Sequence, residues 1–316
     1  MKAEPVVQPR FRLPTLFLGG LIAALVLFAH DHFMALPDRV ASGPGEVTLR
    51  QSPAQLDPAG FRPLRLAGAW VLESDDPRFG GISAAALDGP DFVAITDHGV
   101  MIRFPRPAGA TVTAQIRGLA EGPASGAFKK NRDSEALARD PLGRGWWVAF
   151  EHANQLWLYD RQFARALARV RIPRAETRYN WGVEGLAVVG DSLLALPESG
   201  GLLLRFGPSG WSEARLDFPA SRASDLAVLS PSSLLMIERE TRLLGFSNAL
   251  VRMDRCASGY CLAWRKRLPL GVRDNVEALA VEPGPSGGTR LWLMTDNNGQ
   301  RRIRTLLIAL DLPAGL

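Results

Sequence analysis

Histidine, cysteine and lysine are scarce in this sequence, and the familiar cofactor and nucleotide motifs are missing. Its 316 residues include four histidines and two cysteines, with no H-E-x-x-H, phosphate-binding loop or dinucleotide-binding motif. These absences argue against zinc, nucleotide and redox-cofactor chemistry. The G-x-S-x-G match in the sequence, GPSGG at residues 284–288, lies in a Gly- and Pro-rich turn between two predicted strands and not between a strand and a helix, which disfavours a serine hydrolase. Ser83 paired with His98 is the alternative of that kind, although an ordinary turn histidine is the simpler interpretation of His98.

Positive charge comes almost entirely from arginine. The formal net charge is +5, and lysine occurs only at positions 2, 129, 130 and 266. The arginines are scattered through strand-like segments, as at Arg165, Arg169 and Arg171, and they form no block of like charge and no nucleic-acid-binding motif. We therefore predict a solvated surface and no nucleic-acid partner.

One long apolar run stands near the N-terminus, and no helix-length amphipathic segment follows it. Residues 13–29 are uncharged and come after three basic residues, the pattern of an export signal or a membrane anchor. Phe33 occupies the position before Ala35 where a cleavage site needs a small residue, so an uncleaved anchor is favoured. We predict an anchor segment over residues 1–35 and one exported domain over 36–316, held at the periplasmic face of the inner membrane.

The only two cysteines lie close together in the sequence. Cys256 and Cys261 flank ASGY at a predicted hairpin tip. In the oxidising compartment of an exported protein they would form a disulfide, which adds about 2 kcal/mol by restricting the unfolded chain. Two free thiols are the alternative, and the absence of a nearby histidine makes the pair a poor metal site.

Five segments share one strand pattern, and they begin at Phe79, Asp133, Gly182, Ser224 and Asn275. In each, a short apolar strand follows an acidic or small polar residue, and a turn rich in Gly, Pro, Asp or Ser comes next. A second strand then ends in an acidic residue before a third strand closes the unit. Antiparallel units that repeat every 40–50 residues or so predict an all-β fold, a β-propeller, after the N-terminal hydrophobic helix. Six blades fit the length best and five also fit, with residues 62–74 supplying a strand that helps to close the ring.

Carboxylates recur at two positions of this repeat. The first position carries Ser83, Glu135, Glu184, Asp225 and Glu277, and the second carries Asp97, Glu151, Glu198, Glu238 and Asp296. Innermost strands of a propeller surround one axis, so these side chains would share a small volume at the channel mouth. Like charges that close need a cation or an arginine, and an oxygen-rich donor set favours a hard ion, Ca²⁺ before Mg²⁺. Alternatively, each acid caps a strand end and bonds to backbone amides or to an arginine such as Arg239.

Several strings of the sequence resemble the phytase-like family of exported bacterial proteins, described by "esterase-like activity of phytase". They are DSEALARD…VAFEH, NWGVEGLAV…LPES, SDLAVL…LLMIERE and DNVEALAVE…LMTDNN, with FGGISAAAL…ITDHG as an opening unit. The resemblance spans nearly everything from residue 79 to residue 312. It implies a propeller and, by analogy with alkaline propeller phytases, calcium-assisted hydrolysis of a phosphoester.

The predicted function is therefore hydrolysis of a small-molecule phosphoester or related ester, assisted by a metal ion. The predicted metal ligands are Asp97, Glu135, Glu184, Asp225, Glu238, Glu277 and Asp296. Glu151 or Glu198 would accept the proton of the attacking water, and Arg239 and His152 would neutralise negative charge on the substrate. Asn180 and Asn275 would contribute neutral oxygen atoms to substrate or cation. The alternative is a non-enzymatic, envelope-anchored propeller that binds a protein partner or serves as a scaffold.

Overall fold

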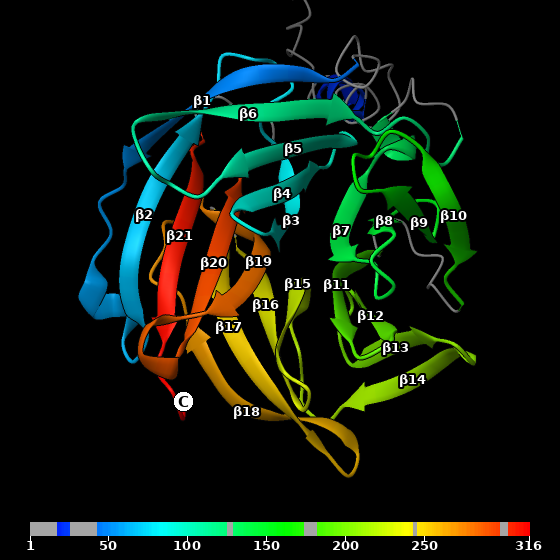
Figure 1. The fold of residues 1–316 in the computed structure, drawn as a ribbon, viewed down its shortest axis with the longest axis vertical. Coiled ribbons are helices and arrows are strands. Elements are labelled where there is room, and N and C mark those ends of the chain that lie inside the picture. The colour runs from blue at the N-terminus through cyan, green and yellow to red at the C-terminus, as the bar shows by residue number, and fades with distance from the viewer. Residues whose placement is uncertain (1–17, 26–42, 125–128, 174–181, 243–244, 298–302) are drawn as a thin grey trace, which may run out of the picture.

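The protein is an all-β molecule with a short N-terminal helix (Figure 1). The computed structural model describes residues 18–25, 43–124, 129–173, 182–242, 245–297 and 303–316, and residues 18–25 are helical. Among these described residues, no helix has both the length and the apolar character needed to cross a membrane. The rest of the predicted anchor segment, residues 13–17 and 26–29, lies outside the described residues.

Turns, loops and three single-turn 3-10 helices connect the strands in the described residues. Their bounds are β1 (Gly45–Pro53), β2 (Arg65–Glu73), β3 (Ile82–Asp88), β4 (Asp91–Thr96), β5 (Val100–Pro105), β6 (Thr111–Gly118), β7 (Ser134–Arg139), β8 (Gly145–Phe150), β9 (Gln155–Asp160), β10 (Ala166–Arg171), β11 (Val183–Val189), β12 (Ser192–Pro197), β13 (Leu202–Gly207), β14 (Gly210–Leu216), β15 (Arg222–Ser230), β16 (Ser233–Arg242), β17 (Gly245–Cys256), β18 (Gly259–Arg267), β19 (Asn275–Pro283), β20 (Thr289–Asp296) and β21 (Thr305–Leu312), with η1 (Pro58–Phe61), η2 (Lys129–Asn131) and η3 (Pro285–Gly287).

Consecutive strands pair antiparallel into radial sheets. β3–β6, β7–β10, β11–β14 and β15–β18 each form such a group, and β19–β21 form another that β2 completes by pairing with β21. The first strands of these groups, β3, β7, β11, β15 and β19, contact one another in a closed ring (Figure 1). Sheets arranged around a ring of inner strands are the architecture of a β-propeller. The predicted closing strand within residues 62–74 is confirmed as β2, which joins the N-terminal part of the chain to its last strand.

Burial falls from the inner strands to the outer ones, and the sequence follows it. Every residue of β8 (GWWVAF) is buried, because neighbouring sheets cover both faces. The outer strand β10 (ALARVR) is mostly exposed and carries Arg169 and Arg171. Arginines on such outer strands contribute part of the scattered positive charge of the sequence. Between sheets, large aromatic side chains fill the space, as where Trp146 stacks on Phe163 at 6.1 Å.

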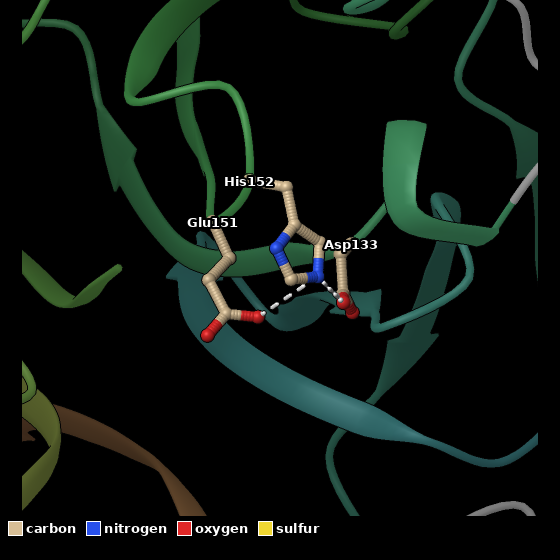
Figure 2. Close-up of side chains that lie close together, drawn as sticks. All are labelled: Asp133, Glu151 and His152. Atoms are coloured by element: carbon tan, nitrogen blue, oxygen red, sulfur yellow. Dashed lines mark ion pairs between the residues drawn. The ribbon is translucent and has the colours of Figure 1, made fainter. Parts of the chain in front are cut away.

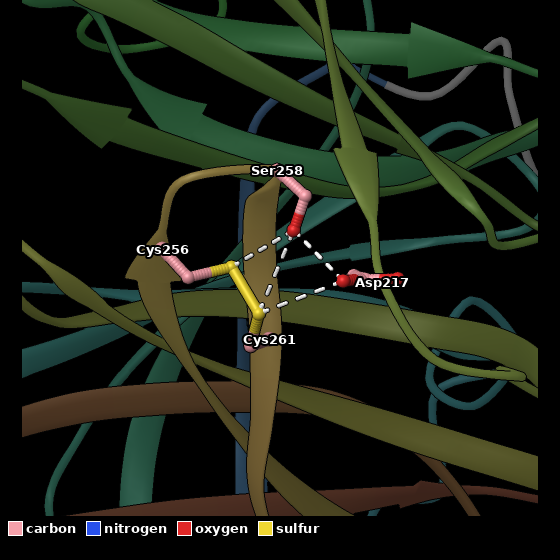
Figure 3. Close-up of a disulfide and its surroundings, with 4 residues drawn as sticks. All are labelled: Asp217, Cys256, Ser258 and Cys261. Carbon is pink, nitrogen blue, oxygen red and sulfur yellow. Dashed lines mark hydrogen bonds between the residues drawn. A yellow bond between two sulfur atoms is a disulfide. The ribbon is translucent and has the colours of Figure 1, made fainter.

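The predicted disulfide between Cys256 and Cys261 is present, at the tip of the β17–β18 hairpin (Figure 3). This tip reaches the neighbouring sheet, because β18 pairs in parallel with β14 through Gly259 and Tyr260. The Ser258 hydroxyl donates a hydrogen bond of 2.8 Å to the carboxylate of Asp217, which follows β14 (Figure 3). A disulfide is typical of proteins outside the cytoplasm.

Candidate functional site

The first carboxylate position of the repeat is a β-bulge. In each inner strand, the pairing with the next strand skips one residue near the strand's start, and these residues are Ser83, Glu135, Glu184, Ser224 and Glu277. A bulge leaves its extra residue out of the ladder and re-aims its side chain. The repeat therefore directs three glutamates and two serines toward the same end of the channel.

The bulge corrects the alignment of the fourth unit by one residue. Ser224, and not Asp225, is the skipped residue of β15. The second position of the repeat shifts in the same way. Ala223 pairs with Glu238, just as Ser134 pairs with Phe150 in the second unit, so Glu238 corresponds to Phe150. The next residue, Arg239, therefore corresponds to Glu151. A Leu-Ala pair follows four of the five bulges, as Leu226–Ala227 does in this unit, and it was the sequence signal for the correct frame.

Asp225 and Glu238 consequently lie away from the other acids. The Asp225 carboxylate accepts hydrogen bonds from the backbone amides of Leu226 (2.7 Å) and Leu279 (2.6 Å) and lines a separate apolar stretch of the channel. Glu238 forms an ion pair with Arg265, with 2.7 Å between Nε and Oε2. Both carboxylates are thus engaged by structural partners outside the cavity described next.

The remaining acids meet in one cavity at the channel mouth. Its volume is about 290 Å³, and it is lined by Ser83, Asp97, Lys129, Asp133, Glu135, Glu151, Glu184, Glu198, Arg222, Arg239, Thr241, Phe246, Asn275, Glu277 and Asp296. Seven of the predicted carboxylates are in this set, together with two other predicted site residues, Arg239 and Asn275. Asn180 lies outside the described residues. Eight carboxylates face three basic side chains here, so the cavity is strongly negative when all are ionised.

One side of the cavity brings a histidine to two acids. The Nε2 atom of His152 lies 3.1 Å from Asp133 and 3.5 Å from Glu151 (Figure 2). One potential ligand atom from each of the three side chains lies within 4.8 Å of the others. The group could hold a metal ion, because ligand atoms around one ion stand at about this spacing.

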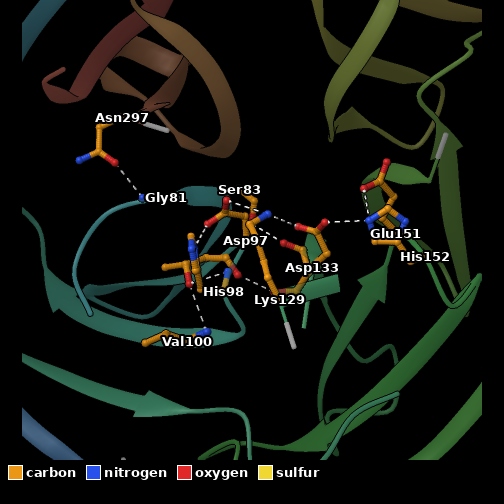
Figure 4. Close-up of polar contacts among 12 residues, drawn as sticks. Gly81, Ser83, Asp97, His98, Val100, Lys129, Asp133, Glu151, His152 and Asn297 are labelled. Carbon is orange, nitrogen blue, oxygen red and sulfur yellow. Dashed lines mark hydrogen bonds and ion pairs between the residues drawn. The ribbon is translucent and has the colours of Figure 1, made fainter. Parts of the chain in front are cut away.

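Two further residues on this side were not predicted. The Lys129 ammonium lies 2.9 Å from Asp133 and 3.2 Å from Asp97, and Asp97 also bonds to His98 (Figure 4). Asp133 stands two residues before the bulged Glu135, the same offset that Asn275 has from Glu277, so the repeat contained a signal for it. Lys129 comes from the β6–β7 connection, outside the repeat, and no pattern pointed to it.

Arginines neutralise the opposite side. Arg239 donates through Nη1 to Glu277 and through Nη2 to Glu198 (3.3 Å), and it stacks on Phe246 at 5.8 Å. Arg222 donates to the same Glu198 oxygen at 3.3 Å. Asn275 donates a 2.6 Å hydrogen bond to Glu277. Each acid on this side therefore has a fixed partner.

Residues 77–299 match the model of a known family, phytase-like, described as "esterase-like activity of phytase". The chain belongs to the phytase-like family. Among curated proteins, none matches its sequence.

Solved structures that resemble this phytase-like chain are remote in sequence. Myxococcus xanthus glutaminyl cyclase is 14% identical, with 74% of this chain and 92% of that one covered and a TM-score of 0.48. The WD40 repeats of RRP9 are 12% identical, with 83% and 99% covered and a TM-score of 0.42. A β-propeller domain from Myceliophteria thermophila is 10% identical, with 79% and 100% covered and a TM-score of 0.39.

On the histidine side of the phytase-like cavity, the pKa values of two carboxyl groups are lowered, which keeps these groups ionised. Burial alone would raise the pKa of Asp133, but the hydrogen bond from His152 and the Lys129 ammonium hold that pKa well below its usual range. Lys129 and His98 likewise outweigh burial and lower the pKa of Asp97. The hydrogen bond to Asp133 raises the pKa of His152. Burial and the negative charge of Asp133 raise the pKa of Glu151 to about 7.

Between the two neutralised sides lie Glu135 and Glu184. Burial raises the pKa of both carboxyl groups well above the ordinary value, and Asp133 adds to the effect at Glu135. Glu184 is 6% exposed and accepts no hydrogen bond and no ion pair from the described residues. A buried carboxylate in that state takes up a proton or attracts a cation.

Proposed function

We propose that this phytase-like protein hydrolyses a phosphoester or a related ester in the cavity at the channel mouth. The observation that carries the proposal is the Asp133–Glu151–His152 group, whose ligand atoms lie close enough to share one ion. Membership of the family supports the class of reaction. The surrounding carboxylates would draw a divalent cation from solution.

The donor set fits a divalent cation and restricts its identity only in part. Asp133 and Glu151 offer carboxylate oxygens, and His152 offers an imidazole nitrogen. Oxygen donors suit calcium, the ion that the family resemblance implies, and also manganese, whereas an imidazole suits zinc better. A bound divalent cation supplies polarisation of an ester oxygen and acidification of a water molecule.

Glu184 is the side chain best placed to move the proton of the attacking water. Its carboxylate lines the cavity, lacks a hydrogen-bond partner among the described residues, and interacts electrostatically with both Glu151 and Arg239. One oxygen of Glu198 and one of Glu277 are already engaged by arginine, whereas both oxygens of Glu184 lack a hydrogen-bond partner among the described residues and can accept a proton. In this assignment Glu151 and His152 hold the cation, and Glu184, predicted as a metal ligand, transfers the proton.

We also propose that the propeller has five blades and works outside the cytoplasm. Five inner strands that contact one another in a closed ring, each the start of a four-stranded group, support the first point. The Cys256–Cys261 disulfide supports the second. Attachment to the inner membrane through residues 13–29 remains a proposal from the sequence.

The experiment compares hydrolysis of p-nitrophenyl phosphate and p-nitrophenyl acetate by the full chain, after chelation and after return of Ca²⁺, Mg²⁺, Mn²⁺ or Zn²⁺. We expect turnover to stop on chelation, to return with one ion, and to be lost in Asp133→Asn and Glu151→Gln. The matched control is Glu240→Gln, since Glu240 is an exposed carboxylate outside the cavity. Turnover that survives chelation, or full activity of both variants, contradicts the metal-assisted mechanism. Absence of turnover with every ion contradicts the enzyme and favours a binding module.

A further inference from the structure

Two arginines stand directly opposite each other at the edge of the cavity. Arg222 begins β15, and its Cα pairs with that of Arg239 on β16. Like charges at opposed positions of an antiparallel pair destabilise the sheet. Glu198 reduces the repulsion, because a single oxygen of its carboxylate accepts a hydrogen bond from each guanidinium at 3.3 Å. Arg222 donates this one hydrogen bond among the described residues, so most of its N–H donors remain available to another anion.

The two guanidinium groups differ in what else holds them. Arg239 is 14% exposed, bonds to Glu277 and stacks on Phe246, although its Nε finds no partner in the described part of the chain. Arg222 is 52% exposed, and Glu198 is its only polar contact among the described residues. The third basic group of the cavity, Lys129, is occupied by Asp97 and Asp133. Arg222 is therefore the cation at the cavity that a ligand from solution can reach.

We propose that Arg222, assisted by Arg239, is the residue that binds the anionic group of the substrate, and that this group is a phosphoryl group. A guanidinium presents N–H donors in a planar fork that matches two oxygens of a phosphate. Two guanidinium groups that already share one carboxylate oxygen would receive a phosphoryl group in its place, with Glu198 as the displaced counter-ion. The cavity would otherwise repel such a substrate, because eight of its lining residues are carboxylates.

This inference rests on the proposed function for the location of the site, and it adds the substrate class. A neutral carboxylic ester would leave the Arg222 guanidinium without a new partner. A phosphomonoester carries negative charge in its ground state, so it gains from the arginines on binding and not only during the reaction. Arg222 is accordingly a specificity-determining residue that acts mainly on substrate affinity.

The experiment measures binding of inorganic phosphate to the full chain by titration calorimetry, with and without a divalent cation. Arg222→Gln should weaken phosphate binding about 10- to 100-fold, the range expected for loss of charge-assisted hydrogen bonds. Arg222→Lys should retain part of the affinity, because it keeps the charge and loses the fork. Arg205→Gln is the matched control, since Arg205 on β13 is similarly exposed and lies 3.9 Å from one acidic partner, Asp191. Circular dichroism and thermal melting verify that each variant is folded.

The outcomes separate this inference from the proposed function. Phosphate binding that depends on Arg222 without hydrolysis of any ester supports the inference and contradicts the enzyme. Hydrolysis of p-nitrophenyl phosphate with an unchanged KM in Arg222→Gln overturns the inference and leaves the enzyme intact. Equal phosphate affinity in Arg222→Gln and the parent protein, no phosphate binding by the parent protein, or tighter binding of acetate than of phosphate each overturns the inference.

Discussion

Removal of the Cys256–Cys261 disulfide should destabilise the protein by an amount that the loop length determines. The two cysteines are five positions apart, so the bond closes a small loop at the tip of the β17–β18 hairpin. For a loop of this size the chain-entropy model gives about 2 kcal/mol. In a domain of nearly 300 residues this corresponds to a decrease in Tm of about 4 °C.

The loss should be concentrated where the hairpin tip meets the neighbouring sheet. The backbone amide of Asp217 donates to the carbonyl of Tyr260 at 2.8 Å, and Ser258 bonds to the Asp217 side chain (Figure 3). In a variant with both cysteines changed to alanine, hydrogen exchange at the Asp217 amide should become faster, whereas amides of β8 should keep their protection.

A second variant breaks the same contact while the disulfide stays intact. Gly259 has a φ of +136°, and a Cβ atom there would stand 2.3 Å from the carbonyl oxygen of Arg215. Gly259→Ala should therefore also expose the Asp217 amide. A Tm unchanged within 1 °C in the cysteine variant, or hydrogen exchange that rises equally in β8, would refute the claim that the disulfide stabilises the contact between the hairpin tip and the neighbouring sheet.

Three other predictions concern buried groups. Asp140→Asn should destabilise the protein by about 1.5–3 kcal/mol at pH 7 and by less at pH 2. Hydrogen bonds from the Arg144 guanidinium (2.9 and 2.8 Å) and from the Trp147 indole (2.9 Å) outweigh burial and lower the folded pKa of Asp140, so its stabilising contribution is lost as the pH falls through that pKa. Urea unfolding at both pH values measures the difference. In metal-free protein, the free energy of unfolding of Glu184→Gln should increase relative to that of the parent as the pH rises from 4 to 8. Burial raises the folded pKa of Glu184, so its ionisation destabilises the folded parent protein above the unfolded pKa. A difference in unfolding free energy that does not depend on pH would contradict this. Phe163→Ala should cost about 3–5 kcal/mol, because it removes a buried ring that stacks on Trp146 and leaves a residue with a Cβ atom at the same φ of 55°; thermal unfolding measures the loss.

The fold could be predicted from the sequence because each repeat shows short apolar strands separated by turn-forming residues. The strands that begin near Asp133, Gly182 and Asn275 were found with their acids in the correct frame, since each apolar run there starts directly after the acid, and the strand near Phe79 was found with Ser83 at the same position. The closing strand β2 was also found, because its apolar residues stand between two turn-rich segments. The arrangement of the strand groups around the ring could not be predicted, because it depends on tertiary contacts that no local sequence pattern contains.

The candidate site was predicted in part, for reasons that differ from residue to residue. Glu135, Glu184 and Glu277 follow from the repeat, because a bulge recurs at the same place in every inner strand. In the fourth unit Ser224 replaces the acid, and the adjacent Asp225 drew the alignment off by one residue. Lys129 enters from a connection outside the repeat, so only the three-dimensional structure brings it to the site.

The most direct test of the account is the metal content of the protein. The full chain, its Asp133→Asn and Glu151→Gln variants and the Glu240→Gln control are each incubated with equal concentrations of Ca²⁺, Mg²⁺, Mn²⁺ and Zn²⁺, passed through a desalting column and analysed by inductively coupled plasma mass spectrometry. We expect about one equivalent of a single divalent ion in the parent protein and in the control, and its loss from both cavity variants. Equal metal content in all four proteins, or no bound ion in the parent, would contradict the claim that the channel-mouth carboxylates form a metal-assisted hydrolytic site.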